Sequence, residues 1–268
     1  MAKQKLHRRL GPVTAAAGLV APLFIGAASA QAQGAAAAAP ATPPAKPWQN
    51  KITAGLTVSD GNSDSVQATV SAESQRKWER DELRIYGQFG YGKTRDQNTG
   101  DYTKSDDYVF ADVQWNHLFT PKFYGGLRLG YRHDDIADLD YRFTISPLVG
   151  YYFIKNEKTL LNAEAGPSYI FEKQGGEEDD YLALRFAQRF EHKFSDKVRI
   201  WEFVEYLPEA EDWAGNYIIN AEVGLEAMLS KALSLRVVAQ NTYDSEPAPG
   251  RDSNDFKLIA GVTYSFGL

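Results

Sequence analysis

The sequence predicts an antiparallel transmembrane β-barrel of about twelve strands, and three observations support this fold class. From residue 48 onward the chain falls into twelve runs in which apolar and polar side chains alternate with the period of two expected of strands. The connections between the runs are alternately short and long, as they are in outer-membrane barrels. Aromatic residues gather at both ends of the runs, where they would form two interfacial girdles.

The first 47 residues are expected to lie outside the barrel. Residues 1–30 have the basic start, apolar stretch and small-residue cleavage site of a secretory signal, with cleavage expected after Ala30 or Ala32. Residues 31–47 are rich in Ala and Pro, which predicts a flexible leader. Residues 48–268 then form the barrel.

Composition narrows the possible functions. The chain has no cysteine, which excludes disulfides and thiolate zinc sites. Removing the signal removes four of the 29 bases and no acid, so the mature chain has 25 bases and 35 acids and a net charge of −10. Such an acidic chain argues against a nucleic-acid partner. No cofactor motif is present, and none is expected.

Each predicted strand shows the same alternation. In the first run, Ile52, Ala54, Leu56 and Val58 share one face. The run at 198–207 fits neither face cleanly, and Gln188 and Asn241 fall on the apolar face as exceptions. In chain order, the predicted strands are residues 50–59, 65–73, 82–92, 108–119, 123–132, 141–154, 160–171, 181–194, 198–207, 217–228, 233–243 and 256–266.

The long connections are expected at the outer end of the barrel, opposite the short periplasmic turns. An even number of strands places both ends of the barrel domain on the turn side. The outer connections, taken as residues 59–65, 93–107, 133–140, 172–180, 208–216 and 244–255, carry a net charge of −17. These acids would face lipopolysaccharide, so we expect that lipid as a partner, with divalent cations as possible bridges.

The polar face of the runs is predicted to line the lumen. Because nine bases face six acids on it, we expect a narrow or plugged bore, and any conductance should be mildly anion-preferring. The predicted lumen-lining residues are Lys51, Arg84, Arg128, Arg132, Arg142, Arg185, Arg189, Arg236 and Lys257, with Glu73, Asp112, Glu164, Glu191, Glu222 and Glu226.

The last run explains why the terminus is so regularly patterned. Its alternate residues Phe256, Leu258, Val262, Tyr264 and Phe266 form a lipid-facing side. The end of this run is similar to the C-terminal signal of outer-membrane barrels. Tyr264 and Phe266 are therefore predicted to form an insertion signal for the barrel-assembly machinery.

One outer connection carries the residues most suggestive of chemistry. Asp134, Asp135, Asp138 and Asp140 are candidates for a divalent-cation site, since hard cations favour carboxylate clusters. With His133 they also leave open a hydrolase site at the rim, because a general base needs a carboxylate near an imidazole. No nucleophile stands out, so no catalytic residue is assigned and the protein is expected not to be an enzyme.

The second half of the chain resembles a known family. The segments LRLGYRHDDIADLDYR, GPSYIFE, EYLPEAEDW and NTYDSEPAPGRDSNDFKLIAGVTYSF are similar to the salt-induced outer membrane proteins, the domain of unknown function 481. The resemblance covers roughly residues 51–266. It implies an outer-membrane barrel linked to salt or osmotic stress and envelope integrity, and it supplies no catalytic residues. A narrow solute channel and a surface adhesion or binding protein remain as alternatives.

Overall fold

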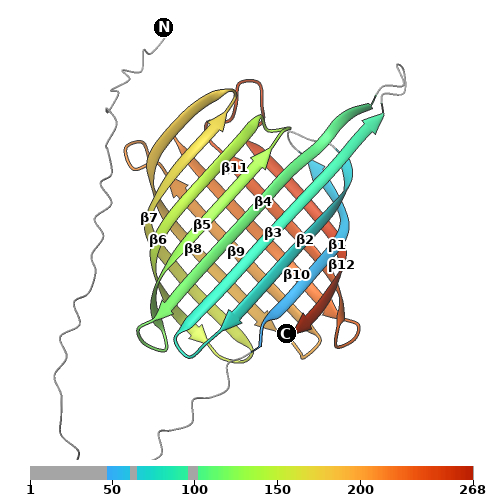
Figure 1. The fold of residues 1–268 in the computed structure, drawn as a ribbon, viewed down its shortest axis with the longest axis vertical. Helices are drawn as coiled ribbons and strands as arrows, with labels where there is room; N and C mark the ends of the chain where they lie inside the picture. The colour runs from blue at the N-terminus through green and yellow to red at the C-terminus, as the bar shows by residue number, and fades with distance from the viewer. Residues whose placement is uncertain (1–46, 61–64, 96–101, 268) are drawn as a thin grey trace, which may run out of the picture. The chain divides into compact units, whose positions relative to one another are not determined.

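The computed structural model describes residues 47–60, 65–95 and 102–267, and within them the chain forms one closed antiparallel barrel (Figure 1). The prediction of a twelve-stranded barrel is confirmed. The strands are β1 (Gln49–Asp60), β2 (Ser65–Lys77), β3 (Asp81–Arg95), β4 (Tyr102–Leu118), β5 (Phe123–Asp134), β6 (Leu139–Lys155), β7 (Thr159–Gln174), β8 (Glu177–Lys193), β9 (Val198–Pro208), β10 (Tyr217–Met228), β11 (Leu233–Asp244) and β12 (Asn254–Gly267).

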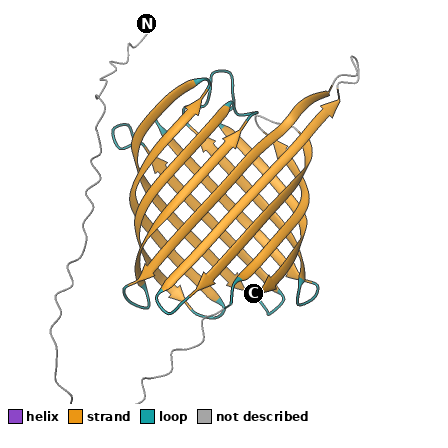
Figure 2. Cartoon of the chain, viewed as in Figure 1, coloured by secondary structure: helices purple, strands orange, loops and turns teal. Residues whose placement is uncertain are grey.

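Each strand pairs with its neighbours in sequence, and the barrel closes where β1 pairs with β12. In that seam Gln49 faces Gly267 and Ile52 faces Tyr264, so both ends of the described chain lie at the turn end. Figure 2 shows strands joined by short loops at this end. None of the described residues belongs to a helix long and apolar enough to cross a membrane. The predicted signal and leader, residues 1–46, fall outside the described residues and stay predictions.

The strands run further toward the loop end than the sequence predicts, which corrects the expected loops. The connection expected at 172–180 is a hairpin whose turn is Gly175 and Gly176, both with positive φ (61° and 78°). The connection expected at 133–140 shrinks to a tight turn with Asp138 at φ 56°. Charged residues in an extended strand still alternate between the two faces. Several acids assigned to outer loops therefore point into the barrel.

The outward face of the barrel is apolar. Leu56 is 61% exposed and Val223 is 56% exposed, although both lie in the middle of a strand. Aromatic side chains pack against each other near both ends of this face, as Tyr131 does with Phe143 at the loop end and Tyr264 with Phe266 at the turn end. A closed barrel leaves no unpaired strand edge, so such a surface suits the hydrocarbon of a membrane.

β9 is the strand whose faces the sequence left unassigned. Its polar residues Arg199 and Glu205 share the inward face with Trp201 and Phe203. The indole of Trp201 lies over Gly224 of β10, where a Cβ would collide with the ring. Trp201 also packs with Val238 and Ile259 in a buried inner cluster. A large apolar residue thus belongs to the inner face because a glycine on the next strand makes room for it.

Candidate functional site: the charged lumen

The lumen contains a cavity of about 790 Å³ that extends along most of its length. At the turn end its lining includes Glu82 and Lys155, and at the loop end it includes Arg142 and Lys257. The cavity is not centred, because the wall formed by β1, β2 and β10–β12 is filled by buried side chains such as Thr57, Thr69, Val238 and Ile259. The remaining space is bordered mainly by charged and amide side chains.

An alternating chain of charges crosses the middle of this space. Arg185 is fully buried and donates from Nη1 to Glu164 Oε2 (2.8 Å) and from Nε to Glu205 Oε1 (2.6 Å). Glu205 also accepts a hydrogen bond from Arg128, which in turn donates to Asp112 Oδ2 (2.5 Å). Each buried ion therefore has a partner of opposite charge, as ions removed from water require.

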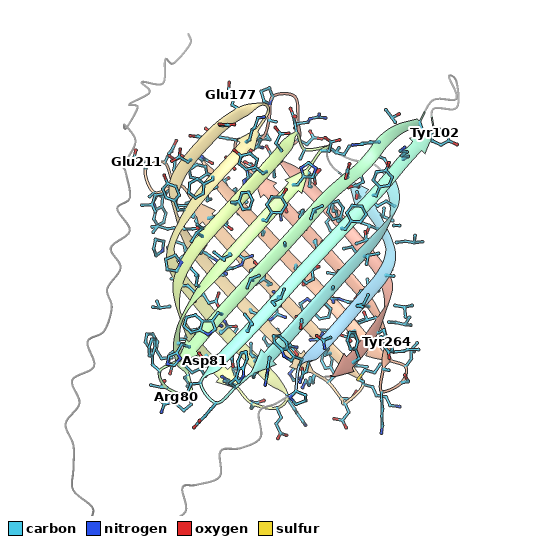
Figure 3. The ribbon with its side chains drawn as sticks, viewed as in Figure 1. Arg80, Asp81, Tyr102, Glu177, Glu211 and Tyr264 are labelled. Carbon is cyan, nitrogen blue, oxygen red and sulfur yellow. The ribbon has the colours of Figure 1, made fainter. Side chains whose placement is uncertain are left out.

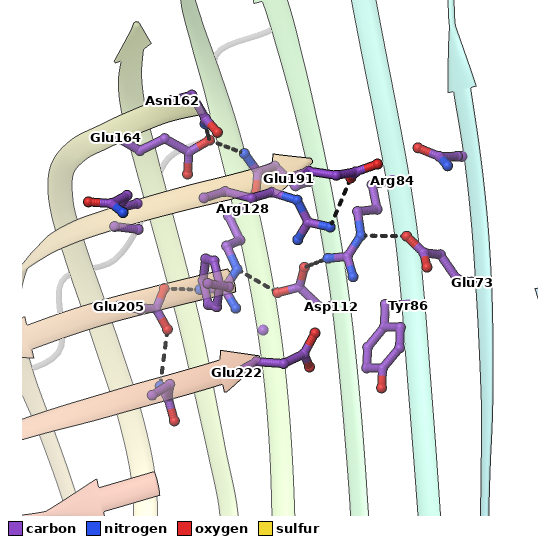
Figure 4. Close-up of a pocket in the computed structure, with 18 of the residues that line it drawn as sticks. Glu73, Arg84, Tyr86, Asp112, Arg128, Asn162, Glu164, Glu191, Glu205 and Glu222 are labelled. Carbon is purple, nitrogen blue, oxygen red and sulfur yellow. Dashed lines mark hydrogen bonds and ion pairs between the residues drawn. The ribbon is translucent and has the colours of Figure 1, made fainter. Parts of the chain in front are cut away.

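Arg84 extends the same chain to the far wall. It donates from Nε to Glu73 Oε1 (2.9 Å), and its Nη1 lies 3.7 Å from Asp112 Oδ1. Figure 4 shows Asp112 between Arg128 and Arg84, with Glu205 and Glu73 at the two ends of this part of the chain. Charges from β2, β3, β4, β5, β7, β8 and β9 thus form one network.

Further contacts join walls that lie far apart round the barrel, and we call them the cross-bore contacts. Arg142 of β6 donates to Asp244 of β11 (2.8 Å), and Lys257 of β12 donates to Asp134 of β5 (3.2 Å). In the circular strand order each of these pairs is five strands apart, close to the largest possible separation. These side chains therefore reach across the bore and not along its wall.

Four more contacts belong to the cross-bore set. Arg132 of β5 donates to Asn220 Oδ1 of β10 (3.1 Å) and to Thr242 Oγ1 of β11 (2.9 Å). Gln88 of β3 donates to Gln240 of β11 (3.1 Å). The Arg128–Glu205 bond, which links β5 to β9, completes the set. Together they span the bore in the middle and the loop half of the lumen.

The turn half of the lumen, which we call the vestibule, has a different pattern. Here Arg199 donates to Glu226 on the adjacent strand (2.9 Å from Nε), and Lys51 reaches the same carboxylate (3.1 Å). Lys155 contacts Glu82 (3.1 Å). These pairs join strands no more than three apart, so they follow the wall and leave the space between the walls open.

The structure places the predicted lumen residues on the inward face, with two distinct surroundings. Most border the cavity, namely Arg84, Arg128, Arg132, Arg142, Arg189, Lys257, Glu73, Asp112, Glu164, Glu191 and Glu222. Arg185, Lys51 and Glu226 are held within the ion-pair network. Arg236 lies apart, with its guanidinium 4.6 Å from the Trp201 ring centroid.

Sequence reasoning missed several inward-facing charges. Arg199 and Glu205 belong to β9, whose alternation was ambiguous. Asp106, Asp134, Glu172 and Asp244 were assigned to outer loops, although continuing the period of two past the expected strand ends would have placed them inside. These six add one base and five acids to the nine and six predicted. Lys77, Lys155, Glu82 and Asp255 also line the cavity and add two of each sign, so bases and acids are close to balance. The expected positive surplus is not present among the described residues.

The rim does not assemble the acids proposed for a cation site. Asp134 points inward to Lys257, Asp135 pairs with Lys104 (2.9 Å), and Asp140 pairs with Lys173 (2.9 Å). Among the described residues, no group of three or more acidic or histidine side chains is arranged to hold a metal ion. The hydrogen bond from Lys104 holds the pKa of Asp135 below its usual value.

The imidazole considered for a rim hydrolase also lacks its expected partner. Nδ1 of His133 lies 2.9 Å from the backbone carbonyl oxygen of Asp140, not from a carboxylate.

The predicted insertion signal lies on the outer face at the turn end, where the rings of Tyr264 and Phe266 stack 5.7 Å apart.

An apolar outer band, two aromatic girdles and a charged lumen define this protein as a membrane β-barrel of the outer-membrane type. The chain belongs to the family described as protein of unknown function, DUF481, whose model matches residues 52–266. The resemblance to the domain of unknown function 481 is therefore confirmed, while the link to salt stress stays a prediction. No curated protein matches the chain.

Solved structures that are similar to this chain have low sequence identity to it. The NanC porin is 7% identical with a TM-score of 0.53, and the match covers 80% of this chain and 100% of that one. The KdgM porin in complex with disordered oligogalacturonate is 10% identical with a TM-score of 0.45, covering 81% and 99%. An anion-selective porin from Comamonas acidovorans is 8% identical with a TM-score of 0.41, covering 82% and 98%.

Proposed function

We propose that the protein is a non-enzymatic outer-membrane barrel that contributes to envelope integrity under salt or osmotic stress, with a lumen closed at rest. The observation that carries this proposal is the set of cross-bore contacts. A pore that conducts constantly needs a continuous wet path, whereas here Arg142 and Asp244, and Lys257 and Asp134, meet across the bore. A barrel closed in this way adds a spanning element to the membrane without adding a leak.

Two features of the rim support a role without catalysis. Lysines contact Asp134, Asp135 and Asp140, and His133 contacts a backbone carbonyl. Neither arrangement provides the imidazole and carboxylate pair that general-base catalysis needs. The exposed acids that remain at the rim, such as Glu177 and Glu211 (Figure 3), suit contact with lipopolysaccharide and its counter-ions.

Recording in planar bilayers tests the closed lumen. Wild-type barrels should show rare openings of low conductance. The triple variant Arg142→Gln, Glu172→Gln, Asp244→Asn neutralises one connected group of cross-bore charges, so no buried ion is left unpaired. We expect it to raise the open probability several-fold. The matched variant Arg84→Gln, Glu73→Gln neutralises a pair that follows the wall and should behave as wild type.

The recordings also distinguish a barrel that is closed at rest from an open channel. Steady, high conductance of the wild-type barrel would contradict a closed lumen. Equal effects of the two variants would show that the cross-bore contacts have no special part in closure.

A narrow solute channel is the second candidate, and the cavity of about 790 Å³ favours it. Opening would require the cross-bore side chains to swing toward the walls, where acceptors are present. Because inward-facing bases and acids are close to balance, we propose that an open state discriminates only weakly between anions and cations, in place of the anion preference inferred from the sequence.

A further inference from the structure

A second site lies outside the barrel, on its outward face at the turn end. Arg76 is near the end of β2, with its side chain among lipid-facing residues. Its guanidinium carbon lies 5.0 Å from the ring centroid of Trp78 and 5.7 Å from that of Trp48. The two indoles meet edge to face, with centroids 6.3 Å apart. We call this group the Trp–Arg–Trp patch.

The charge of Arg76 has no acceptor among the residues that the structure describes. Nε is buried without a hydrogen-bond partner, and no hydrogen bond or ion pair reaches the guanidinium from the described part of the chain. Two inward-facing arginines at this end of the barrel differ. Inside the barrel, Arg84 and Arg199 each contact carboxylates. Arg76 is thus a cation held by two aromatic rings, with its hydrogen-bonding capacity unused.

A second donor beside the patch is also unmatched. Asn50 of β1 faces Ser74 across the strand pair, and Ser74 lies two residues before Arg76 on the same face. The Ser74 hydroxyl donates to Asn50 Oδ1 (2.6 Å), while Asn50 Nδ2 is buried without an acceptor. Two nitrogen donors on one face therefore lack the anion or carbonyl that would satisfy them.

A nearby patch on the same face shows that such donors are satisfied elsewhere. At the turn end of β4, Trp115 Nε1 and His117 Nδ1 both contact Asp81 Oδ1, at 3.1 and 3.0 Å. There the chain supplies its own acceptor. At the Trp–Arg–Trp patch it supplies none, so the acceptor must come from the surroundings.

The depth of the patch identifies those surroundings. Asn50 pairs with Phe266 across the barrel seam, in the girdle that also contains Tyr264. Figure 3 shows Tyr264 and the turn residue Arg80 both at the turn end of the barrel. Indole and phenol rings favour the interface between hydrocarbon and headgroups. At this level, the abundant acceptor is the phosphate group of a lipid.

We propose that the Trp–Arg–Trp patch binds the phosphodiester group of a phospholipid in the leaflet at the turn end. The Arg76 guanidinium offers a planar pair of N–H donors that matches two phosphate oxygens. Asn50 Nδ2 adds a donor beside it, and the flanks of Trp48 and Trp78 contact the glycerol and upper acyl chains. This site is independent of the lumen and of whether the lumen conducts.

Native mass spectrometry of the purified barrel in a maltoside detergent tests the site. Dioleoyl phosphatidylglycerol is titrated against wild type, Arg76→Gln and the matched control Arg80→Gln, which removes an exposed turn arginine four residues away. We expect Arg76→Gln to weaken phospholipid binding about tenfold, the loss of a charged hydrogen bond. Arg80→Gln should bind as wild type does. Dioleoylglycerol, which lacks the phosphate, should bind all three equally weakly.

The outcomes are decisive in both directions. Equal phosphatidylglycerol affinity for wild type and Arg76→Gln would overturn the proposal. Displacement of the lipid by millimolar inorganic phosphate would show that the patch takes a soluble anion instead. Heat-modifiable migration on gels checks that each variant is folded. Should Arg76→Gln fail to fold, Trp78→Leu keeps the charge but removes one ring, and unchanged lipid affinity in that variant would equally overturn the site.

Discussion

The vestibule and the cross-bore half of the lumen contain the same kinds of charged residues but connect them differently. In the vestibule, Arg84 pairs with Glu73 on the next strand, and Arg199 with Glu226 on the next. In the other half, Arg142 and Lys257 reach partners five strands away. The difference teaches that the number of inward charges does not decide whether a barrel is open. What decides it is whether each charge finds its partner along the wall or across the bore.

The largest expected effect compares a fully buried arginine with a partly exposed one. Arg185→Met should reduce the free energy of unfolding by about 3–5 kcal/mol, because Glu164 and Glu205 would keep buried charges without their common partner. Arg84→Met should cost only about 1 kcal/mol, since the Arg84 side chain is 34% exposed to the wet vestibule. Urea unfolding in lipid vesicles measures both. Similar costs would mean that the surroundings of Arg185 and Arg84 do not differ in solvation.

The comparison assumes that the charged face is the inner one, and an inserted charge tests this. Val223→Arg places a cation on the lipid-facing surface and should cost about 2–4 kcal/mol if it lies near the midplane. Gln75→Arg adds the same side chain beside the vestibule, where water reaches it, and should cost less than about 1 kcal/mol. The same unfolding assay applies, and equal costs would contradict the face assignment.

Ion selectivity tests the charge balance of the lumen at an arginine whose carboxylate partner is distant. Arg189 borders the vestibule, and its nearest carboxylate, Glu191, lies 3.9 Å away. In barrels opened by the triple cross-bore variant, we expect anion and cation permeabilities within about twofold of each other. Adding Arg189→Gln should shift the reversal potential toward cations. A strong preference for either ion before that change would contradict the charge balance.

The smallest expected effect concerns the rim, outside both regions. Asp135 has a lowered pKa because Lys104 donates a hydrogen bond to it. A carboxyl whose folded pKa is depressed contributes stability above its unfolded pKa of about 3.9, and loses it as pH falls through the lower folded value. Carbon NMR should show Asp135 titrating below that value, and Lys104→Gln should return it to normal. An unchanged titration would mean that the pair does not persist in solution.

The sequence alone established much of the fold, and the reason is the period of a strand. Alternating Ile52, Leu56 and Val58, or Leu258, Val262 and Tyr264, place one side of each run in an apolar environment whatever the neighbouring strands do. Short and long connections then fix the antiparallel order. Strand ends were harder to place, because the acids of 172–180 resemble a loop in composition although they form a two-residue hairpin.

The charged site was predicted only in part. Arg84, Arg128 and Glu164 follow from alternation, but Glu205 does not, because Trp201 and Phe203 share its face and disguise the polar side of β9. Trp201 can face inward only because Gly224 lies opposite on β10. That pairing depends on register, which a single strand does not reveal.

The sequence by itself determined the barrel, its twelve strands and the division into an apolar outside and a charged inside. These follow from local spacing, which acts within one strand. Only the tertiary structure decided that Arg142 meets Asp244, that Lys257 meets Asp134, and that no acceptor from the described residues reaches Arg76. The paired residues are separated by up to 123 positions in the chain and by five strands in the barrel. Closure of the sheet brings them together, and closure is a property of all twelve strands at once.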